Sequence, residues 1–139
     1  MTRSVSALAV VSLSTLLACK SDVTVPAAPL DRTLSASSVD GQSLPVLLRE
    51  SPGEFNHLTQ FKITFAPDGL WTAVAFFYPD GSTATVNVND NGWYRFDGTT
   101  LLMHSNFSRT DWPGSVRWDT IFLSAKLANA DAYHSFVLP

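Results

Sequence analysis

The 139-residue sequence is poor in cysteine and in charge, with one cysteine, Cys19, and only 15% Asp, Glu, Lys and Arg. A single cysteine excludes an internal disulfide, so the folded part must be held together by its core alone. The formal net charge of −3 gives no basic stripe of the kind that nucleic-acid binding requires. After residue 31 no stretch sustains a helical period, which argues against an α-helical domain.

The sequence also lacks the short motifs that carry common chemistry. It has no Gly-x-Ser-x-Gly turn, no His-Glu-x-x-His pair, no glycine-rich phosphate loop and no pair of cysteines. The histidines, His57, His104 and His134, are far apart in sequence, whereas a metal site needs at least three converging ligands. We therefore expect no enzyme activity, no metal, no cofactor and no nucleic-acid partner.

The first 18 residues have the three parts of a secretory signal peptide. Arg3 is their only charge, residues 5–18 are apolar or small, and Ala18 precedes Cys19. This apolar run of 14 residues is shorter than the roughly 20 residues that a membrane-spanning helix needs. The sequence therefore predicts export, with residues 1–18 removed.

Residues 16–19, Leu-Leu-Ala-Cys, resemble the lipobox of bacterial lipoproteins. The resemblance implies that the Cys19 thiol is lipidated, that the signal is cut before it, and that the new amino group is acylated. Three acyl chains exceed the two signals that stable anchoring needs. Lys20 follows the cysteine, and by the sorting rule of such lipoproteins this implies the outer membrane, facing the periplasm. The alternative is that Cys19 is a small apolar residue at the end of an ordinary signal.

Residues 20–31 contain two prolines and several small residues without periodicity, which is typical of a flexible tether. We assign residues 1–18 to the signal peptide and residues 19–31 to the lipidated cysteine and linker. Residues 32–139 are long enough for one domain and too short for two.

From residue 32 onward, turn signals recur at short intervals. Asp-Gly and Asn-Gly pairs tolerate the positive φ that tight hairpin turns require. Between them lie short runs in which apolar and polar residues alternate, such as residues 61–65, FKITF. Alternation of this kind is typical of an antiparallel sheet with one buried face. The turn signals are Asp40-Gly41, Asp68-Gly69, Asp80-Gly81, Asn91-Gly92 and Asp97-Gly98.

These patterns predict an all-β fold of eight or nine short strands. Short connections favour pairing between strands that are neighbours in sequence, which gives an antiparallel meander. We expect such a meander to curl until it closes, or nearly closes, into a small barrel, because closure removes exposed edges. The predicted strands span 33–39, 44–49, 60–66, 70–78, 82–88, 93–96, 99–104, 116–124 and 132–138.

The spacing of these signals resembles that of the small lipocalin-like domains found on bacterial lipoproteins. The resemblance is carried by the stretches SSVDGQSLP, ITFAPDGLWT and GWYRFDGTTLLM, the last with a Gly-x-Tyr-x-x-x-Gly-x-x-Leu rhythm. It covers most of residues 32–138 and implies a barrel domain. The Gly-x-Trp signature near the first strand of true lipocalins is missing, so the resemblance does not extend to a ligand cavity.

Residues 70–78, LWTAVAFFY, are apolar on both faces of the predicted strand. One face fills the barrel, and three alternatives exist for the cover of the other. Aromatic residues of the loop expected at 105–115 fold back over it, or a protein partner docks there, or an apolar ligand binds. The candidate contact residues are Trp71 and Phe77 on this strand and Phe107, Arg109, Asp111 and Trp112 in the loop.

The sequence favours a non-catalytic, membrane-anchored envelope lipoprotein that binds a small apolar ligand or an envelope protein partner. The alternative is a structural or hydrolase-inhibitory lipoprotein that acts through the 105–115 loop. An enclosed apolar cavity of roughly 300 Å3 or more favours the ligand carrier. A filled barrel from which Trp112 or Phe107 protrudes favours docking or inhibition.

Overall fold

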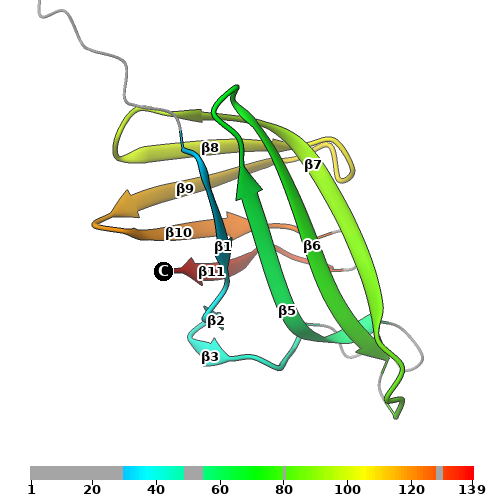
Figure 1. The fold of residues 1–139 in the computed structure, drawn as a ribbon. Coiled ribbons are helices and arrows are strands. Elements are labelled where there is room, and N and C mark those ends of the chain that lie inside the picture. Colours follow the sequence, from blue (N-terminus) through cyan, green and yellow to red (C-terminus); the bar gives the residue numbers. More distant parts are fainter. Residues whose placement is uncertain (1–29, 49–54, 80, 128–129) are drawn as a thin grey trace, which may run out of the picture.

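The computed structural model describes residues 30–48, 55–79, 81–127 and 130–139. In these residues eleven strands form one antiparallel sheet, which curls through 265° into a half-barrel (Figure 1). The predicted all-β antiparallel fold is confirmed. No helix in these four ranges is long and apolar enough to cross a membrane. The strands are β1 (Arg32–Ser35), β2 (Ser38–Val39), β3 (Gln42–Ser43), β4 (Val46–Leu47), β5 (Phe55–Phe65), β6 (Leu70–Pro79), β7 (Val86–Phe96), β8 (Thr100–Ser105), β9 (Asp111–Arg117), β10 (Thr120–Ala125) and β11 (His134–Leu138).

Strands β5 to β11 pair with their sequence neighbours, so the predicted meander is confirmed. The segment from β1 to β2 bridges its two edges, because β1 pairs with β5 and β2 pairs with β11. Between them, the Ala36 N–H donates to the Phe61 carbonyl (2.9 Å) and the Ser37 N–H to the Val137 carbonyl (2.8 Å). The short strands β3 and β4 pair with β2 and β5. One continuous segment therefore nearly closes the sheet.

The concave side of the sheet holds an aromatic core. In β5 the predicted alternation is confirmed, since Phe61, Ile63 and Phe65 are buried and Lys62 and Thr64 point outward. Aromatic side chains meet across the interior with ring-centroid distances from 4.7 to 5.2 Å, which favours a well-packed core. The largest fully buried side chains are Trp71, Trp112, Phe61, Phe65, Phe77 and Phe136.

Three of the predicted turns are confirmed by their backbone conformation. Gly41, Gly69 and Gly98 have φ values of 76°, 84° and 102°, the left-handed region that glycine adopts without steric cost. Asp40 also has a positive φ of 50°, which suits the two-residue turn between β2 and β3. Gly81 has φ 76°, but its partner Asp80 lies outside the described residues.

The turn predicted at Asn91-Gly92 is wrong, because β7 runs through both residues. The strands predicted at 82–88 and 93–96 are therefore one strand that begins at Val86. Gly92 serves a close approach of two strands: a Cβ atom there would lie 1.7 Å from the His104 carbonyl oxygen of β8. The Trp71 indole lies beside it and donates to the Trp93 and His104 carbonyls at 3.1 and 3.2 Å.

The single strand predicted at 116–124 is also wrong, because β9 and β10 form a hairpin there. Its two-residue turn is Trp118-Asp119, a pair that carries no turn signal. Trp118 has φ 57°, where a side chain costs about 1–2 kcal/mol relative to the right-handed region. Since β9 starts at Asp111, the loop expected at 105–115 is shortened to residues 106–110. The hairpin, the break between β1 and β2 and the unpredicted strand β3 add three strands, and the merger into β7 removes one, so the structure has eleven strands in place of the predicted eight or nine.

The half-barrel has two ends, which we call the entry end and the loop end. The entry end carries the start of β1, the β5–β6, β7–β8 and β9–β10 turns, and the C-terminus (Figure 1). The loop end carries the β8–β9 loop and the β6–β7 and β10–β11 connections. At the entry end the Tyr94 hydroxyl lies within hydrogen-bonding distance of the Leu30 and Ala66 carbonyls, at 2.8 and 2.7 Å. Burial raises the pKa of Tyr94, so it stays a donor and fixes the chain where it enters the domain.

Candidate functional site

The β8–β9 loop, residues 106–110, presents two of the predicted contact residues at the loop end. The Phe107 side chain is 62% exposed, and Arg109 is exposed with a positive φ of 54°. Aromatic and arginine side chains are enriched among the residues that dominate protein–protein binding. The geometry of this loop therefore determines what the surface can bind.

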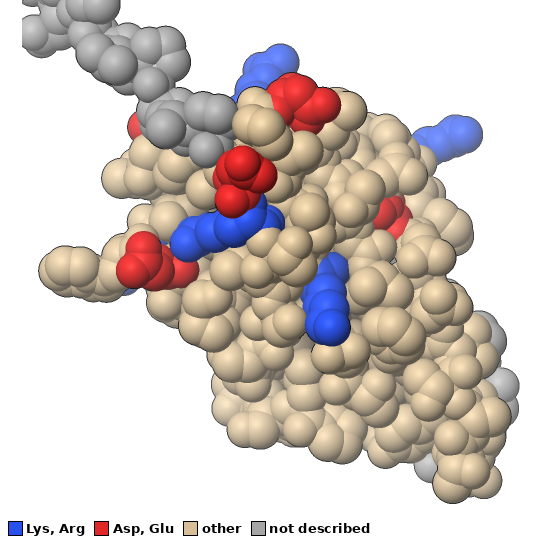
Figure 2. Space-filling model, in the orientation of Figure 1, with Lys and Arg blue, Asp and Glu red and all other residues tan. Residues whose placement is uncertain are grey.

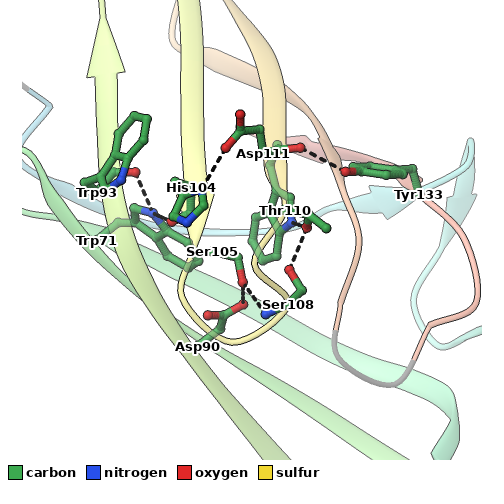
Figure 3. Close-up of polar contacts among 10 residues, drawn as sticks. Trp71, Asp90, Trp93, His104, Ser105, Ser108, Thr110, Asp111 and Tyr133 are labelled. Atoms are coloured by element: carbon green, nitrogen blue, oxygen red, sulfur yellow. Dashed lines mark hydrogen bonds and ion pairs between the residues drawn. The ribbon is translucent and has the colours of Figure 1, made fainter.

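A buried carboxylate holds the first half of the loop. Asp90, on the inward face of β7, is only 9% exposed. It accepts hydrogen bonds from the Ser105 hydroxyl (2.6 Å), the Asn91 N–H (2.7 Å) and the Phe107 N–H (3.3 Å), as Figure 3 shows in part. A buried carboxylate is costly unless it is hydrogen-bonded in this way. Asp90 thus uses its bonds to fix the backbone at Phe107.

A second set of hydrogen bonds ties the rest of the loop to the core (Figure 3). The Ser108 N–H donates to the Ser105 hydroxyl (2.9 Å), and the Ser108 and Thr110 hydroxyls lie 2.6 Å apart. The buried Trp112 indole N–H donates to the Thr110 hydroxyl (3.2 Å). The loop is therefore preorganised, and it loses little conformational entropy when a partner binds.

Polar and aromatic side chains extend this surface over the outer face of β7, β8 and β9. His104 Nδ1 lies 2.7 Å from an Asp111 carboxylate oxygen, and its ring stacks on Trp93 with centroids 5.4 Å apart. The Arg95 guanidinium lies 5.1 Å from the centroid of the same indole. The half-exposed Tyr133 donates its hydroxyl proton to the Asp111 carbonyl (3.1 Å) (Figure 3).

Residue types of a Ser-His-Asp triad occur here without its arrangement. Ser105 and His104 are sequence neighbours on β8, so their side chains point to opposite faces of the sheet. Ser105 donates to the buried Asp90, whereas His104 pairs with Asp111 on the outer face. The geometry therefore does not place the histidine beside this hydroxyl.

A second histidine–aspartate pair lies where β11 meets the β2–β3 turn. His134 Nδ1 lies 2.6 Å from one Asp40 carboxylate oxygen, and the Ser135 N–H donates to the other at 2.7 Å. Partial burial raises the pKa of the Asp40 carboxyl, but these hydrogen bonds outweigh it and leave the pKa below its usual value. In the part of the chain that the structure describes, no three His, Cys, Asp or Glu side chains converge as a metal site requires.

The structure separates the predicted contact residues into two groups. Trp71, Phe77 and Trp112 are buried, and Trp71 packs on Trp112 with ring centroids 5.0 Å apart. Trp71 and Phe77 thus lie on the face of β6 that fills the half-barrel, and Trp112 packs against that face from β9. Phe107, Arg109 and Asp111 are exposed at the loop end. Cys19 lies outside the described residues.

Sequence reasoning missed Tyr133, His104 and the anchoring role of Asp90. A signal for Asp90 was present, because Val86, Val88 and Asp90 share one face of an alternating strand. A carboxylate on an apolar face indicates a buried polar partner, here Ser105. No comparable signal marks Tyr133, which reaches Asp111 only through the fold.

Depressions on the described surface have volumes from 240 to 470 Å3 and open to solvent. The depression of 470 Å3 lies across β9, β10 and β11 and is lined in part by the exposed Phe122. No family model matches the sequence, and neither a curated protein nor a solved structure matches it. The candidate site therefore has to be interpreted from its own geometry.

Proposed function

We propose that the protein is a non-catalytic binding module of the bacterial cell envelope, anchored by lipid on Cys19. Its domain resembles the small lipocalin-like domains of bacterial lipoproteins and docks an envelope protein through its loop end. The observation that carries this proposal is the preorganised β8–β9 loop, which holds Phe107 62% exposed above a buried carboxylate. Docking would bury this exposed apolar side chain against the partner.

The packing of the core favours a protein partner over a small apolar ligand. The aromatic side chains that would line a ligand cavity, including Trp71, Phe77 and Trp112, are fully buried among one another. The surface depressions are open, whereas ligand sites bury most of the surface of a bound molecule. Docking at an exposed aromatic and an arginine needs no cavity.

The position of the chain entry also favours docking through the β8–β9 loop. Leu30, the first described residue, lies at the entry end and leads back to Cys19. The β8–β9 loop lies at the other end of β8 and β9 from the β7–β8 and β9–β10 turns (Figure 1). Anchoring of the module through Cys19 by a flexible tether therefore leaves the β8–β9 loop accessible to a partner.

Inhibition of a hydrolase is the second candidate for this docking. The observation that favours it is the rigidity of the loop, because an inhibitory loop must enter a cleft without losing much conformational freedom. Under this proposal Phe107 or Arg109 enters the cleft of the enzyme.

Site-specific photo-crosslinking in intact cells tests the proposal. A photoreactive residue in place of Phe107 is expected to give a discrete adduct with one envelope protein, and Arg109→Ala is expected to weaken it at least tenfold. The matched control is the same residue in place of Phe122, which is 43% exposed on β10 near the β9–β10 turn of the entry end. The absence of an adduct from position 107, or the same adduct from both positions, contradicts docking through the loop end.

A further inference from the structure

Trp118 is the most exposed large apolar side chain of the described residues, at 98%. It occupies the first position of the two-residue β9–β10 turn, with φ 57°. Glycine, asparagine and aspartate suit this conformation, and a tryptophan does not. Neither burial nor backbone preference explains a tryptophan at this position, which indicates a contact outside the domain.

The β9–β10 turn lies at the entry end, where the chain enters the domain. Strand pairing places it there. Arg32 at the start of β1 pairs with Phe65 at the end of β5. Ser115, near the end of β9, pairs with Thr100, the first residue of β8 after the β7–β8 turn. Figure 1 shows the hairpin tip and the start of β1 on the same end of the half-barrel. Trp118 therefore projects from the end that leads to Cys19.

We propose that Trp118 inserts its indole into the membrane interface and forms a second contact beside the lipid anchor. This inference rests on the proposed anchoring through Cys19. Eleven residues lead from Cys19 to Leu30, so the tether spans at most about 40 Å when fully extended. That reach keeps the entry end at high effective concentration near the bilayer. Tryptophan is the side chain most suited to the headgroup region, because its ring is apolar and its N–H remains hydrated.

The charges of the entry end indicate how this contact works. Both signs are present there and intermixed, as Figure 2 shows for one face. The balance gives no polybasic patch that would attract anionic lipid. The contact should therefore form on zwitterionic membranes and should be insensitive to salt. The charged residues next to the entry-end turns and the start of β1 are Asp31, Arg32, Asp68, Arg95, Asp97, Arg117 and Asp119.

Tryptophan quenching by brominated lipid tests the contact. The chain from Cys19 to Pro139 has one thiol, which can be coupled to maleimide-bearing lipid in phosphatidylcholine vesicles with brominated acyl chains. Flotation verifies the coupling, and the coupling itself does not depend on lipidation in cells. We expect quenching and a shift of emission to shorter wavelength, both unchanged by salt. Trp71 and Trp112 are buried, and the half-buried Trp93 is present in both proteins, so the loss of both effects in Trp118→Asn assigns them to Trp118.

The control variants separate the membrane contact from other roles. Asparagine suits the turn, so Trp118→Asn is expected to fold with equal or higher thermal stability. Adding Phe107→Trp to that variant places an indole at the loop end, which is expected to remain unquenched. Unquenched wild-type protein on coupled vesicles, or equal quenching in Trp118→Asn, overturns the inference. A concentration-dependent emission shift without vesicles also overturns it, because it shows a second copy as the occupant. Unmodified Cys19 in cells would refute the proposed anchor and leave this test informative.

Discussion

Removal of the Asp90 carboxylate is predicted to release the β8–β9 loop. In Asp90→Ala the hydroxyl of the fully buried Ser105 and the Asn91 and Phe107 N–H groups lose their acceptor. A buried polar group without a partner costs about 1–3 kcal/mol, and the two N–H groups near the surface cost less because water reaches them. We expect a loss of about 2–4 kcal/mol, a large part of the 5–15 kcal/mol that stabilises a typical domain.

The size of the effect should depend on the acceptor that remains. Asp90→Asn keeps one carbonyl oxygen for the two N–H donors and loses only the charge-assisted bond from Ser105, so we expect a loss of about 1–2 kcal/mol. The matched control is Asp97→Asn, because the single Asp97 oxygen that caps the β7–β8 turn is retained in asparagine. Hydrogen bonds from the Thr100 and Thr99 N–H groups lower the pKa of Asp97, so this variant should lose some stability at pH 7, but less than Asp90→Ala.

Urea denaturation and amide hydrogen exchange measure the two consequences. The Phe107 and Ser108 N–H groups bond directly to the Asp90–Ser105 pair, so their exchange should accelerate in Asp90→Ala more than that of the β5 amides. The midpoint temperature of thermal unfolding should fall by about 4 °C or more for each kcal/mol of stability lost. Wild-type stability in Asp90→Ala, or unchanged exchange at Phe107, refutes the role assigned to this carboxylate.

Three further variants test other parts of the fold. Gly92→Ala should lower the free energy of unfolding in urea by about 3 kcal/mol or more, because its Cβ would overlap the His104 carbonyl. Gly41→Ala has open space around it and should lower that free energy by about 1 kcal/mol from its positive φ alone. Asp40→Asn should lower the urea midpoint at pH 7 and converge with the wild type in acid. The lowered pKa of Asp40 means that its stabilisation is present above pH 3.8 and is lost as pH falls through that pKa. Tyr94→Phe should cost about 1 kcal/mol, measured by the thermal midpoint, because the carbonyls at the chain entry lose their donor.

Each of these outcomes has a clear opposite. Equal losses for the two glycine variants would show that the close strand approach at Gly92 is relaxed in solution. If the difference in urea midpoint between Asp40→Asn and the wild type did not change with pH, the Asp40 carboxylate would not contribute to the loss of stability in acid. A Tyr94→Phe variant as stable as the wild type would mean that its hydroxyl does not fix the entry.

The alternation of apolar residues and the Asp-Gly pairs were sufficient to predict the sheet and its meander order. They failed where a residue serves a contact distant in sequence. Gly92 reads as a turn beside Asn91, yet its small size is needed because β8 passes close to it. Trp118-Asp119 reads as strand, because a tryptophan with positive φ matches no local preference.

The candidate site was predictable only in part, for the same reason. Phe107 and Arg109 could be assigned to a loop, because the sequence shows where the strand before them ends and the strand pattern is interrupted. Trp112 could not be separated from that loop, since its burial depends on Trp71, which lies 41 residues earlier on β6. The Asp90 network required the inward face of β7 to be known.

Mass spectrometry of the mature N-terminus tests the proposed anchoring most directly. We predict that the processed protein begins at Cys19, with a diacylglyceryl group on its sulfur and an acyl chain on its amino group. A mature chain with a free Cys19 thiol, or one cut at another residue, would contradict it.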